Sequence, residues 1–165
     1  MVVGTTCAGK TTVAKRLAEQ HGLPHVELDA LHWGPGWSQP TAEEFRARVE
    51  EALAGDEWVP DGAYHGKHGG LVLDRAELVV WFDPPLHTVL YRLGTRTVRR
   101  VRSGEELWGG NRETWRGTVF SRDSLLLWAL TTHRPRRVRY EERLARYDVV
   151  RLRSASETEG WLHGR

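Results

Sequence analysis

Residues 4–12 read Gly-Thr-Thr-Cys-Ala-Gly-Lys-Thr-Thr and decide the fold. Their spacing, G-x-x-x-x-G-K-[ST], is typical of a loop that wraps around phosphate. The surroundings fit the motif, because residues 1–3 form a short apolar stretch and residues 10–21 have the apolar periodicity of a helix that stops at Gly22. The succession of strand, glycine-containing loop and helix predicts a nucleotide-binding α/β domain.

Each residue type in this loop has a chemical reason. Gly4 and Gly9 allow backbone conformations that a side chain would obstruct, and the N–H groups between them would surround phosphate at the N-terminus of the helix. Lys10 should reach the β- and γ-phosphates of ATP, and the Thr11 hydroxyl should bind Mg²⁺. Cys7 is expected to be a small spacer. The predicted cofactor-binding residues are Gly4, Thr5, Thr6, Cys7, Ala8, Gly9, Lys10, Thr11 and Thr12.

The remainder of the chain alternates short apolar runs with helix-period segments, as in an α/β domain with a mostly parallel sheet. No linker divides the sequence, so we expect one domain over residues 1–165. Pro60 cannot donate to a sheet, so the third strand should lie at an edge or end there. The predicted strands cover residues 1–3, 25–28, 58–60, 78–82 and 148–152. The predicted helices cover 10–21, 42–54, a segment from 86 up to a glycine-containing lid at 103–122, then 123–131, 135–146 and 154 onward.

Acidic residues follow three of the predicted strands: Asp29, Asp61 and Asp83. In an open α/β sheet ligands bind at the carboxyl ends of the strands, so these carboxylates should converge near the phosphates. Asp83 ends the most apolar strand and is the predicted holder of Mg²⁺, together with Thr11. Asp29 and Asp61 are better placed to orient an attacking hydroxyl or to take its proton.

The charge of the chain is divided unevenly. Residues 1–85 carry a net charge of −6, whereas residues 86–146 carry +8, and all 14 basic residues of the latter segment are arginines. The planar guanidinium group of arginine has a fork of hydrogen-bond donors that fits phosphate and carboxylate groups. The segment therefore suggests an anionic ligand or nucleic acid. A solvated, arginine-preferring helix surface explains the same pattern equally well.

Composition excludes some classes of protein. Hydrophobic residues make up 39% of the chain, which is too many for a disordered protein, and no apolar run approaches the length of a membrane span. The single cysteine excludes an internal disulfide, and no signal-peptide pattern opens the sequence, so we expect a cytoplasmic protein.

The chain resembles P-loop kinases of the adenylate-kinase-like group, and more narrowly the bacterial proteins known as DNA topology modulation proteins or adenylate-kinase-related ATPases. The likeness covers nearly the whole chain. It implies a three-layer P-loop NTPase fold, a five-stranded parallel sheet in the order 2-3-1-4-5 with helices on both faces, and an arginine-rich lid. The residues that carry it are GTTCAGKTT at 4–12, HVELDALHWGPGW at 25–37, EWVPDGAYHG at 57–66, LVVWFDPP at 78–85, LYRLGTRTVRR at 90–100 and GNRETWR at 110–116.

The resemblance gives the arginine segment and the tryptophans specific roles. Phosphoryl transfer depends on positioning and charge neutralisation. A closing lid would therefore bring arginines to the phosphate, where the P-loop lysine already contributes a positive charge. A small-molecule acceptor would bind in the region after the second and third strands, where relatives tend to have Asn at position 63 and an aliphatic residue at position 60. The predicted phosphate contacts are Arg96, Arg112 and Arg116, with Gly109-Gly110 as hinge, and Lys10, Asp29 and Asp61 complete the catalytic set. The predicted acceptor contacts are Asp29, Trp33, Trp37, Asp61, Tyr64 and Arg92; Arg134, Arg136, Arg137 and Arg139 are expected on the surface.

Three functions follow from these patterns. The leading hypothesis is an ATP- and Mg²⁺-dependent phosphotransferase that acts on a nucleotide or another hydroxylated metabolite. The second is an ATP-binding regulator whose basic surface contacts DNA or RNA, although acidic residues interrupt the basic segment and no nucleic-acid-binding motif is evident. The third is an NTPase that acts as a switch.

Overall fold

The computed structural model describes residues 1–68, 70–116, 118 and 124–164. Its centre is a five-stranded sheet in the order β2-β3-β1-β4-β5, with every neighbouring pair parallel. This arrangement confirms the fold class and the strand order that the resemblance implies. The strands are β1 (Val2–Gly4), β2 (His25–Glu27), β3 (Val59–Asp61), β4 (Val79–Phe82) and β5 (Val149–Leu152).

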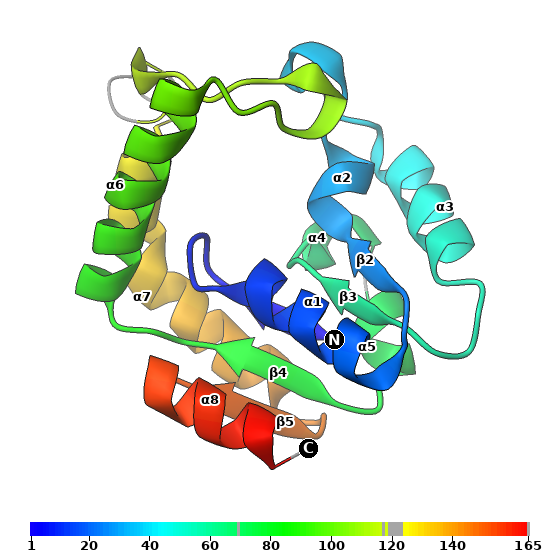
Figure 1. Ribbon diagram of the computed structural model, residues 1–165. Coiled ribbons are helices and arrows are strands. Elements are labelled where there is room, and N and C mark those ends of the chain that lie inside the picture. The colour runs from blue at the N-terminus through cyan, green and yellow to red at the C-terminus, as the bar shows by residue number, and fades with distance from the viewer. Residues whose placement is uncertain (69, 117, 119–123, 165) are drawn as a thin grey trace.

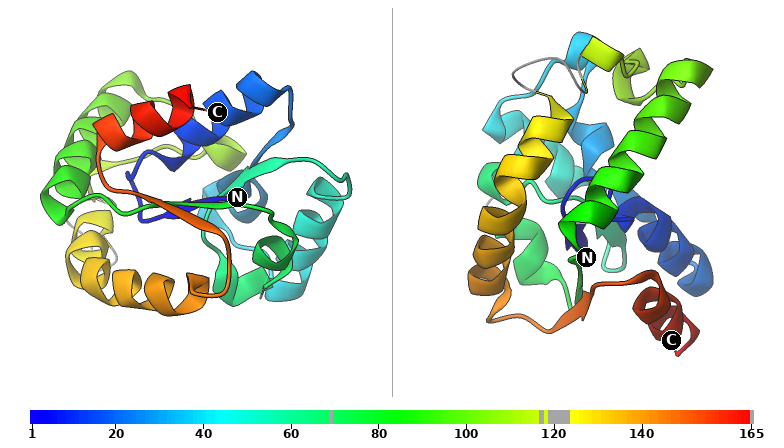
Figure 2. Two further views of the ribbon diagram at one scale, coloured as in Figure 1. Left: turned by 90° about the horizontal axis from the view of Figure 1, so that it is seen from below. Right: turned by 90° about the vertical axis from the view of Figure 1, so that its left-hand side faces the viewer.

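Helices cover both faces of the sheet, so the domain has three layers (Figures 1 and 2). α1 and α8 lie on one face, and α3, α5 and α7 lie on the other. The α-helices are α1 (Lys10–His21), α2 (Leu28–His32), α3 (Ala42–Ala52), α4 (His65–His68), α5 (Leu71–Arg75), α6 (Leu86–Ser103), α7 (Leu125–Leu144) and α8 (Ala155–His163). Two short 3₁₀ helices are η1 (Pro35–Trp37) and η2 (Trp108–Gly110).

The core follows the alternation of side chains along the strands. Val3 and Trp81 point to the face that packs on α3, α5 and α7, in one apolar cluster with Phe45. Val2 and Phe82, each one residue away, belong to the cluster under α1 and α8. Burial on both faces explains why these strands read as continuous apolar runs in the sequence.

The expected edge position of the third strand is wrong. β3 lies between β2 and β1, and Pro60 is its middle residue, opposite Val26. The amide of Val59 donates to the Pro24 carbonyl on the β2 side, whereas the amide of Gly62 donates to Val2 on the β1 side. Since amide directions alternate along a strand, position 60 faces the β1 side two residues ahead of the Gly62–Val2 hydrogen bond, before β1 begins. Pro60 therefore interrupts none of the described hydrogen bonds between β3 and β1.

Two other boundaries differ from the sequence prediction. β2 ends at Glu27, and Leu28 already begins α2, so Asp29 stands on the first turn of a helix. The two helices predicted at 123–131 and 135–146 are one helix, α7, which continues through Pro135. Apolar packing of α7 against α6 and the sheet, through Ala129, Tyr140 and Leu144, outweighs the hydrogen bond that a proline removes.

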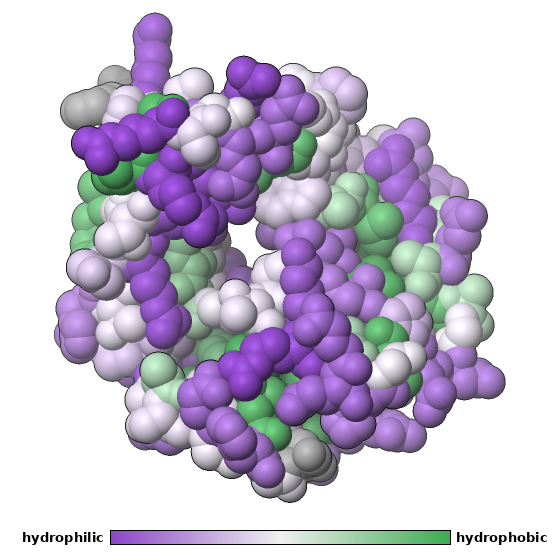
Figure 3. All heavy atoms as spheres, in the orientation of Figure 1, coloured by the Kyte–Doolittle hydropathy of each residue, from purple (hydrophilic) through white to green (hydrophobic). Residues whose placement is uncertain are grey.

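Residues 104–116, which follow α6, extend across the molecule toward α2 and η1 (Figure 1), and the space-filling view in Figure 3 shows a hollow beneath them. Figure 3 shows that hydrophilic residues border this hollow. Ser103, the first residue of the predicted lid, still belongs to α6, and residues 104–116 contain η2 and an isolated antiparallel bridge between Glu106 and Arg112. Of the remaining lid residues only Thr118 lies within the described ranges. None of the described helices is both long and apolar enough to cross a membrane.

Candidate functional site

The loop between β1 and α1 has the backbone that its glycines predict. Gly4 has a φ of 147°, and a Cβ there would lie 2.4 Å from the Phe82 carbonyl oxygen, so β4 leaves no room for a side chain. Gly9 has a φ of 105°, and Cys7 also has a positive φ, 54°. The loop therefore curls tightly at the carboxyl end of β1 and leads directly into the N-terminus of α1, where backbone N–H groups favour an anion.

Lys10 lies inside this loop. Its Nζ donates a hydrogen bond to the Thr5 carbonyl oxygen at 2.9 Å. Burial lowers the pKa of Lys10, while Asp29 and Asp61 act in the opposite direction and raise it. A half-buried ammonium group near two carboxylates is placed to neutralise phosphate oxygens that enter the loop.

Asp61 ends β3 beside the P-loop. Its side chain is almost completely buried, and His25 Nε2 lies 3.8 Å from its Oδ2. Burial raises the pKa of Asp61 more than the Thr11 hydroxyl, Lys10 and His25 lower it. Oδ2 has no hydrogen-bond partner among the described residues. Oδ2 thus faces His25, whereas the carboxylate group also interacts with the Thr11 hydroxyl. Asp61 therefore stands beside the threonine that is predicted to bind Mg²⁺, and carboxylate and hydroxyl oxygens are ligands that this ion prefers.

Asp83, predicted to hold Mg²⁺, is engaged elsewhere. Arg137 Nε donates to its Oδ1 at 2.8 Å, and Arg151 Nε donates to its Oδ2 at 3.0 Å. The guanidinium of Arg151 also lies 4.0 Å from the centroid of the Trp81 ring. Arginines thus neutralise both carboxylate oxygens of Asp83, which speaks against the binding of a metal ion by this residue. Asp83 instead forms a cluster of ion pairs with Arg137 and Arg151.

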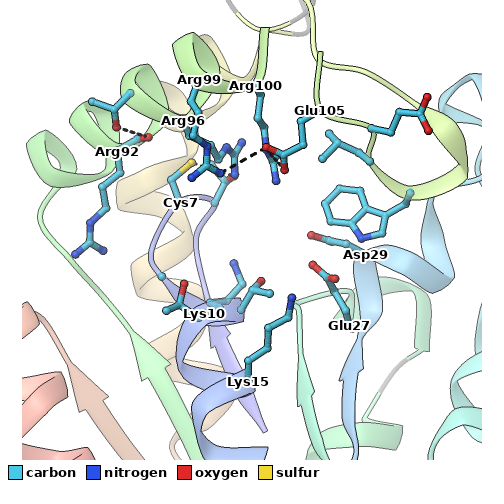
Figure 4. A pocket seen from close by; sticks show the side chains of 18 residues that line it. Cys7, Lys10, Lys15, Glu27, Asp29, Arg92, Arg96, Arg99, Arg100 and Glu105 are labelled. Atoms are coloured by element: carbon cyan, nitrogen blue, oxygen red, sulfur yellow. Dashed lines mark hydrogen bonds and ion pairs between the residues drawn. The ribbon is translucent and has the colours of Figure 1, made fainter. Parts of the chain in front are cut away.

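Three cavities meet around the P-loop. The phosphate-loop cavity, of about 750 Å³, lies in front of Lys10 and Thr11 (Figure 4). The aromatic cavity, of about 360 Å³, shares Thr6, Lys10 and Asp29 with it. The outer cavity, of about 630 Å³, shares Gly9, Thr12 and Arg92 with it and extends to residues 153–155 after β5. The phosphate-loop cavity therefore lies between the other two.

The aromatic cavity contains several of the predicted acceptor residues. Tyr64 donates a hydrogen bond from its hydroxyl to Asp29 Oδ1, and burial together with this carboxylate raises the pKa of Tyr64 far above its ordinary range. Trp33 lines the same cavity. Trp37 does not line it but packs edge-to-face on Trp33, with ring centroids 5.5 Å apart. Asp61 is not among the residues lining the cavity, and its place is beside Thr11.

The arginines of α6 lie over the phosphate-loop cavity (Figure 4). Arg92 donates from Nη1 to the Ala8 carbonyl oxygen at 2.7 Å, so it supports the P-loop from outside, away from the aromatic cavity where acceptor contact was expected. Arg96, a predicted phosphate contact, lines the phosphate-loop cavity, and so do Arg99 and Arg100. Arg96 and Arg100 both donate to Oε1 of the largely buried Glu113, at 3.3 and 2.9 Å.

Arg112 and Arg116, the other two predicted phosphate contacts, are exposed and do not line the three cavities. Arg112 pairs with Glu106 at 2.7 Å on the surface. Glu113 lies between the two arginines in sequence and turns inward, so the side chains of Arg112 and Arg116 point away from the cavities. Among the described residues of segment 86–146, six arginines lie within ion-pair distance of carboxylates: Arg96, Arg99, Arg100, Arg112, Arg137 and Arg146.

A strap joins the lid to the loop after α2. Asn111 is buried; its Oδ1 accepts from the Trp37 amide at 2.9 Å, and its Nδ2 donates to the Gly34 carbonyl at 2.8 Å. A Cβ on Gly109 would lie 2.6 Å from the Gly34 carbonyl carbon, so the two backbones touch. The predicted hinge at Gly109-Gly110 is therefore the point at which the lid contacts the Gly34–Trp37 loop.

Sequence reasoning missed several residues at the cavities. Glu27 and Arg100 line the phosphate-loop cavity, and burial raises the pKa of Glu27. Arg136, expected on the surface, lines the aromatic cavity with Trp128. The spacing of eight residues between Trp128 and Arg136 places both on one face of a helix, a signal that the predicted break before Pro135 concealed.

No protein-family model matches the chain. An adenylate dimethylallyltransferase of Agrobacterium tumefaciens (strain Ach5) is 34% identical over 92 residues, which cover 45% of this chain and 38% of that protein. That of Agrobacterium vitis is 30% identical over 96 residues, covering 47% and 40%. The chain thus spans about 40% of the length of these curated relatives.

A solved structure that the chain resembles covers almost all of it. Deoxyadenosine kinase from M. mycoides, with bound dCTP, aligns with a TM-score of 0.56 at 10% identity over 99% of this chain and 97% of that one. At such low identity the likeness concerns the fold alone. With the sheet order and the glycine-containing loop, it shows that the chain has the three-layer P-loop fold.

Proposed function

We propose that the protein is an ATP- and Mg²⁺-dependent phosphotransferase that acts on a small acceptor, either a nucleotide or another hydroxylated metabolite. The observation that carries this proposal is the arrangement of the three cavities, with the P-loop in the middle one and a separate cavity on each side. A transfer between two bound molecules needs a central cavity of this kind, because the donor phosphate and the acceptor must meet in one place.

On the donor side, the outer cavity would hold the nucleoside of ATP, and its phosphates would cross Gly9, Thr12 and Lys10 into the phosphate-loop cavity. Lys10 and Arg96 would neutralise the charge of the transferred group. Thr11 and Asp61 would hold Mg²⁺, which would withdraw charge from the phosphate group when bound. Among the described residues no cluster of three metal-ligating side chains occurs.

On the acceptor side, Asp29 stands at the boundary between the aromatic and phosphate-loop cavities. Its carboxylate would orient the attacking oxygen of the acceptor and accept its proton where that oxygen is a hydroxyl. The hydrogen bond from Tyr64 fixes the carboxylate in position. Trp33 would pack against a ring of the acceptor.

The test is ATP turnover by the purified protein with nucleosides, nucleotides and sugars as acceptors. We expect Lys10→Met to lower turnover by about 100-fold or more, because a preorganised charge at the transferring phosphate is lost. Arg46→Met, which removes a surface partner of Glu50 on α3, should leave turnover unchanged. Equal turnover by the Lys10 variant and the unaltered protein would refute the mechanism.

A second candidate is transfer of a dimethylallyl group to adenylate, favoured by the names of the curated relatives. A dimethylallyl donor whose leaving group is a diphosphate would offer the P-loop the same kind of oxyanion as ATP does. Incubation with AMP and dimethylallyl diphosphate separates the two candidates, because only prenyl transfer consumes this donor without forming ADP.

The regulator that binds DNA or RNA stays a weaker hypothesis. The six arginines that pair with carboxylates are partly neutralised within the protein, which leaves fewer of them for phosphate contacts. A gel-shift titration at about 50 mM salt, where phosphate contacts are strongest, tests it, and absence of binding would remove this function. Phosphate release from ATP that needs no acceptor would instead indicate the NTPase switch.

A further inference from the structure

Glu113 comes from the lid and joins two arginines of α6. Its side chain is only 7% exposed, and its Oε1 accepts hydrogen bonds from Arg96 Nη2 at 3.3 Å and Arg100 Nη1 at 2.9 Å. Both arginines line the phosphate-loop cavity, whereas Glu113 does not. Figure 4 shows the two arginines on the α6 side of this cavity, with Lys10 on the opposite side. The carboxylate of Glu113 therefore neutralises positive charge that the cavity would otherwise present to a ligand.

The hydrogen bonding of this cluster is incomplete. Oε2 of Glu113 is buried and has no hydrogen-bond partner among the described residues, and the same is true of Nε in both arginines. Arg100 Nε contacts Glu105 only as an ion pair, at 3.4 Å. Neither arginine forms with Glu113 the two parallel hydrogen bonds that make the strongest arginine–carboxylate contact. Asp83, by contrast, accepts hydrogen bonds on both of its oxygens. Another anion can therefore replace Glu113 more readily than it could replace Asp83.

A polyphosphate is a stronger partner for these arginines than Glu113 is. It carries more negative charge than one carboxylate, and several of its oxygens can accept from each guanidinium fork. Without phosphate, the Glu113 carboxylate offsets the repulsion between the two guanidinium groups. With phosphate in the cavity, the same carboxylate repels the ligand. Glu113 thus stabilises the empty site and weakens the binding of phosphate.

We propose that Glu113 is an internal counter-ion which polyphosphate displaces, and that it sets the affinity of the phosphate-loop cavity for the phosphates of the donor. Arg96 and Arg100 would exchange the Glu113 carboxylate for phosphate oxygens. The lid carries Glu113, so it would lose two hydrogen bonds to α6 in the same step. This inference rests on the proposed function in one respect: it takes the phosphate-loop cavity to be the place where donor phosphates bind.

Calorimetric titration with inorganic tripolyphosphate, without Mg²⁺ and without an acceptor, tests the inference. We expect Glu113→Gln to bind tripolyphosphate about 3- to 10-fold more tightly than the unaltered protein, because the amide keeps the shape of the side chain and removes its charge. Glu50→Gln removes the same charge from an exposed ion pair on α3, and it should change this affinity by less than about twofold.

A double-mutant cycle shows whether Glu113 acts through the arginines. In an Arg96→Met background the gain from Glu113→Gln should shrink to about twofold or less, because one of the two partners is already absent. Thermal unfolding shows the temperature range in which each variant is folded. Should Glu113→Gln not fold, Glu113→Asp is the second variant. It is one methylene shorter, so both contacts weaken, and tripolyphosphate should bind about twofold more tightly.

The inference is overturned by unchanged or weaker tripolyphosphate binding in both Glu113 variants, by an equal gain in Glu50→Gln, by the full gain in the Arg96→Met background, or by no tripolyphosphate binding at all. Weaker binding would mean that Glu113 instead holds the arginines in place for phosphate. Because binding is measured without transfer, the two proposals fail separately. Tighter binding by Glu113→Gln in a protein that transfers no phosphate from ATP would refute only the reaction. Phosphate transfer with unchanged tripolyphosphate affinity in that variant would refute only the role of Glu113.

Discussion

Asp61 and Asp83 occupy the same kind of place in the fold and have different surroundings. Asp61 is the last residue of β3 and Asp83 follows the last residue of β4, on either side of β1, and both are buried. Arg137 and Arg151 neutralise Asp83. Asp61 faces Thr11 and Lys10 and keeps one oxygen without a hydrogen bond in the described structure. A carboxylate at the carboxyl end of a parallel strand can reach the ligand-binding site of the sheet. The charged residues around that carboxylate decide whether it is available to a ligand.

The largest effect should come from Asp61→Asn. Loss of the carboxylate removes the proposed Mg²⁺ ligand, and we expect ATP turnover to fall by about 100-fold or more at millimolar Mg²⁺. Asp83→Asn, assayed at a temperature where it is folded, should keep turnover within about threefold. A larger loss of turnover in the Asp83 variant than in the Asp61 variant would reverse the comparison.

Asp83→Asn should instead lower stability. Removing one partner of a fully buried ion pair costs about 3 to 5 kcal/mol, and partial exposure of Arg137 and Arg151 reduces the expected loss to about 2 kcal/mol. Urea unfolding followed by tryptophan fluorescence measures this difference. An unchanged unfolding midpoint would show that the cluster around Asp83 contributes nothing.

The pH dependence of stability sharpens the same comparison. Because burial raises the pKa of Asp61, the folded protein holds this proton more tightly than the unfolded chain does. The stability that Asp61 contributes is present at low pH and is lost as the pH rises through the raised pKa. We therefore expect Asp61→Asn to be more stable than the unaltered protein at pH 8, with the difference shrinking toward pH 4. Unfolding curves at both pH values would show the opposite trend if Lys10 dominated the environment of Asp61.

The smallest effect should come from Arg112→Ala. Its pair with Glu106 is exposed, with side-chain exposures of 60% and 62%, and such surface pairs contribute less than about 1 kcal/mol. Turnover should stay within about twofold, whereas Arg96→Ala, at the phosphate-loop cavity, should lower it by about 10-fold or more. Equal losses in the two variants would mean that the lid turns Arg112 inward during the reaction.

Local chemistry made the P-loop predictable from the sequence, because strand, loop and helix follow one another within about 20 residues and carry their own glycine and periodicity signals. The strand order was predicted only through the resemblance to P-loop kinases. The partners of Asp83 could not be predicted in this way. Arg137 and Arg151 lie 54 and 68 residues further along the chain, and only the pairing of β4 with β5 and the docking of α7 bring them to it. Arg136 was misplaced for a similar reason, because packing carries α7 through Pro135. The narrower likeness to DNA topology modulation proteins stays a prediction.

The strap at Asn111 affects how molecules enter and leave. Because Asn111 bonds to both Gly34 and Trp37, and Gly109 touches the same loop, the lid and the loop beside Trp33 are fastened to each other in the described structure. If the lid separates from this loop, these hydrogen bonds must break. If the hydrogen bonds stay intact, movement of the lid must carry the Trp33 loop along. Movement of the chain on the two sides of the P-loop is thereby linked. A molecule that binds on one side therefore also affects entry to the other side.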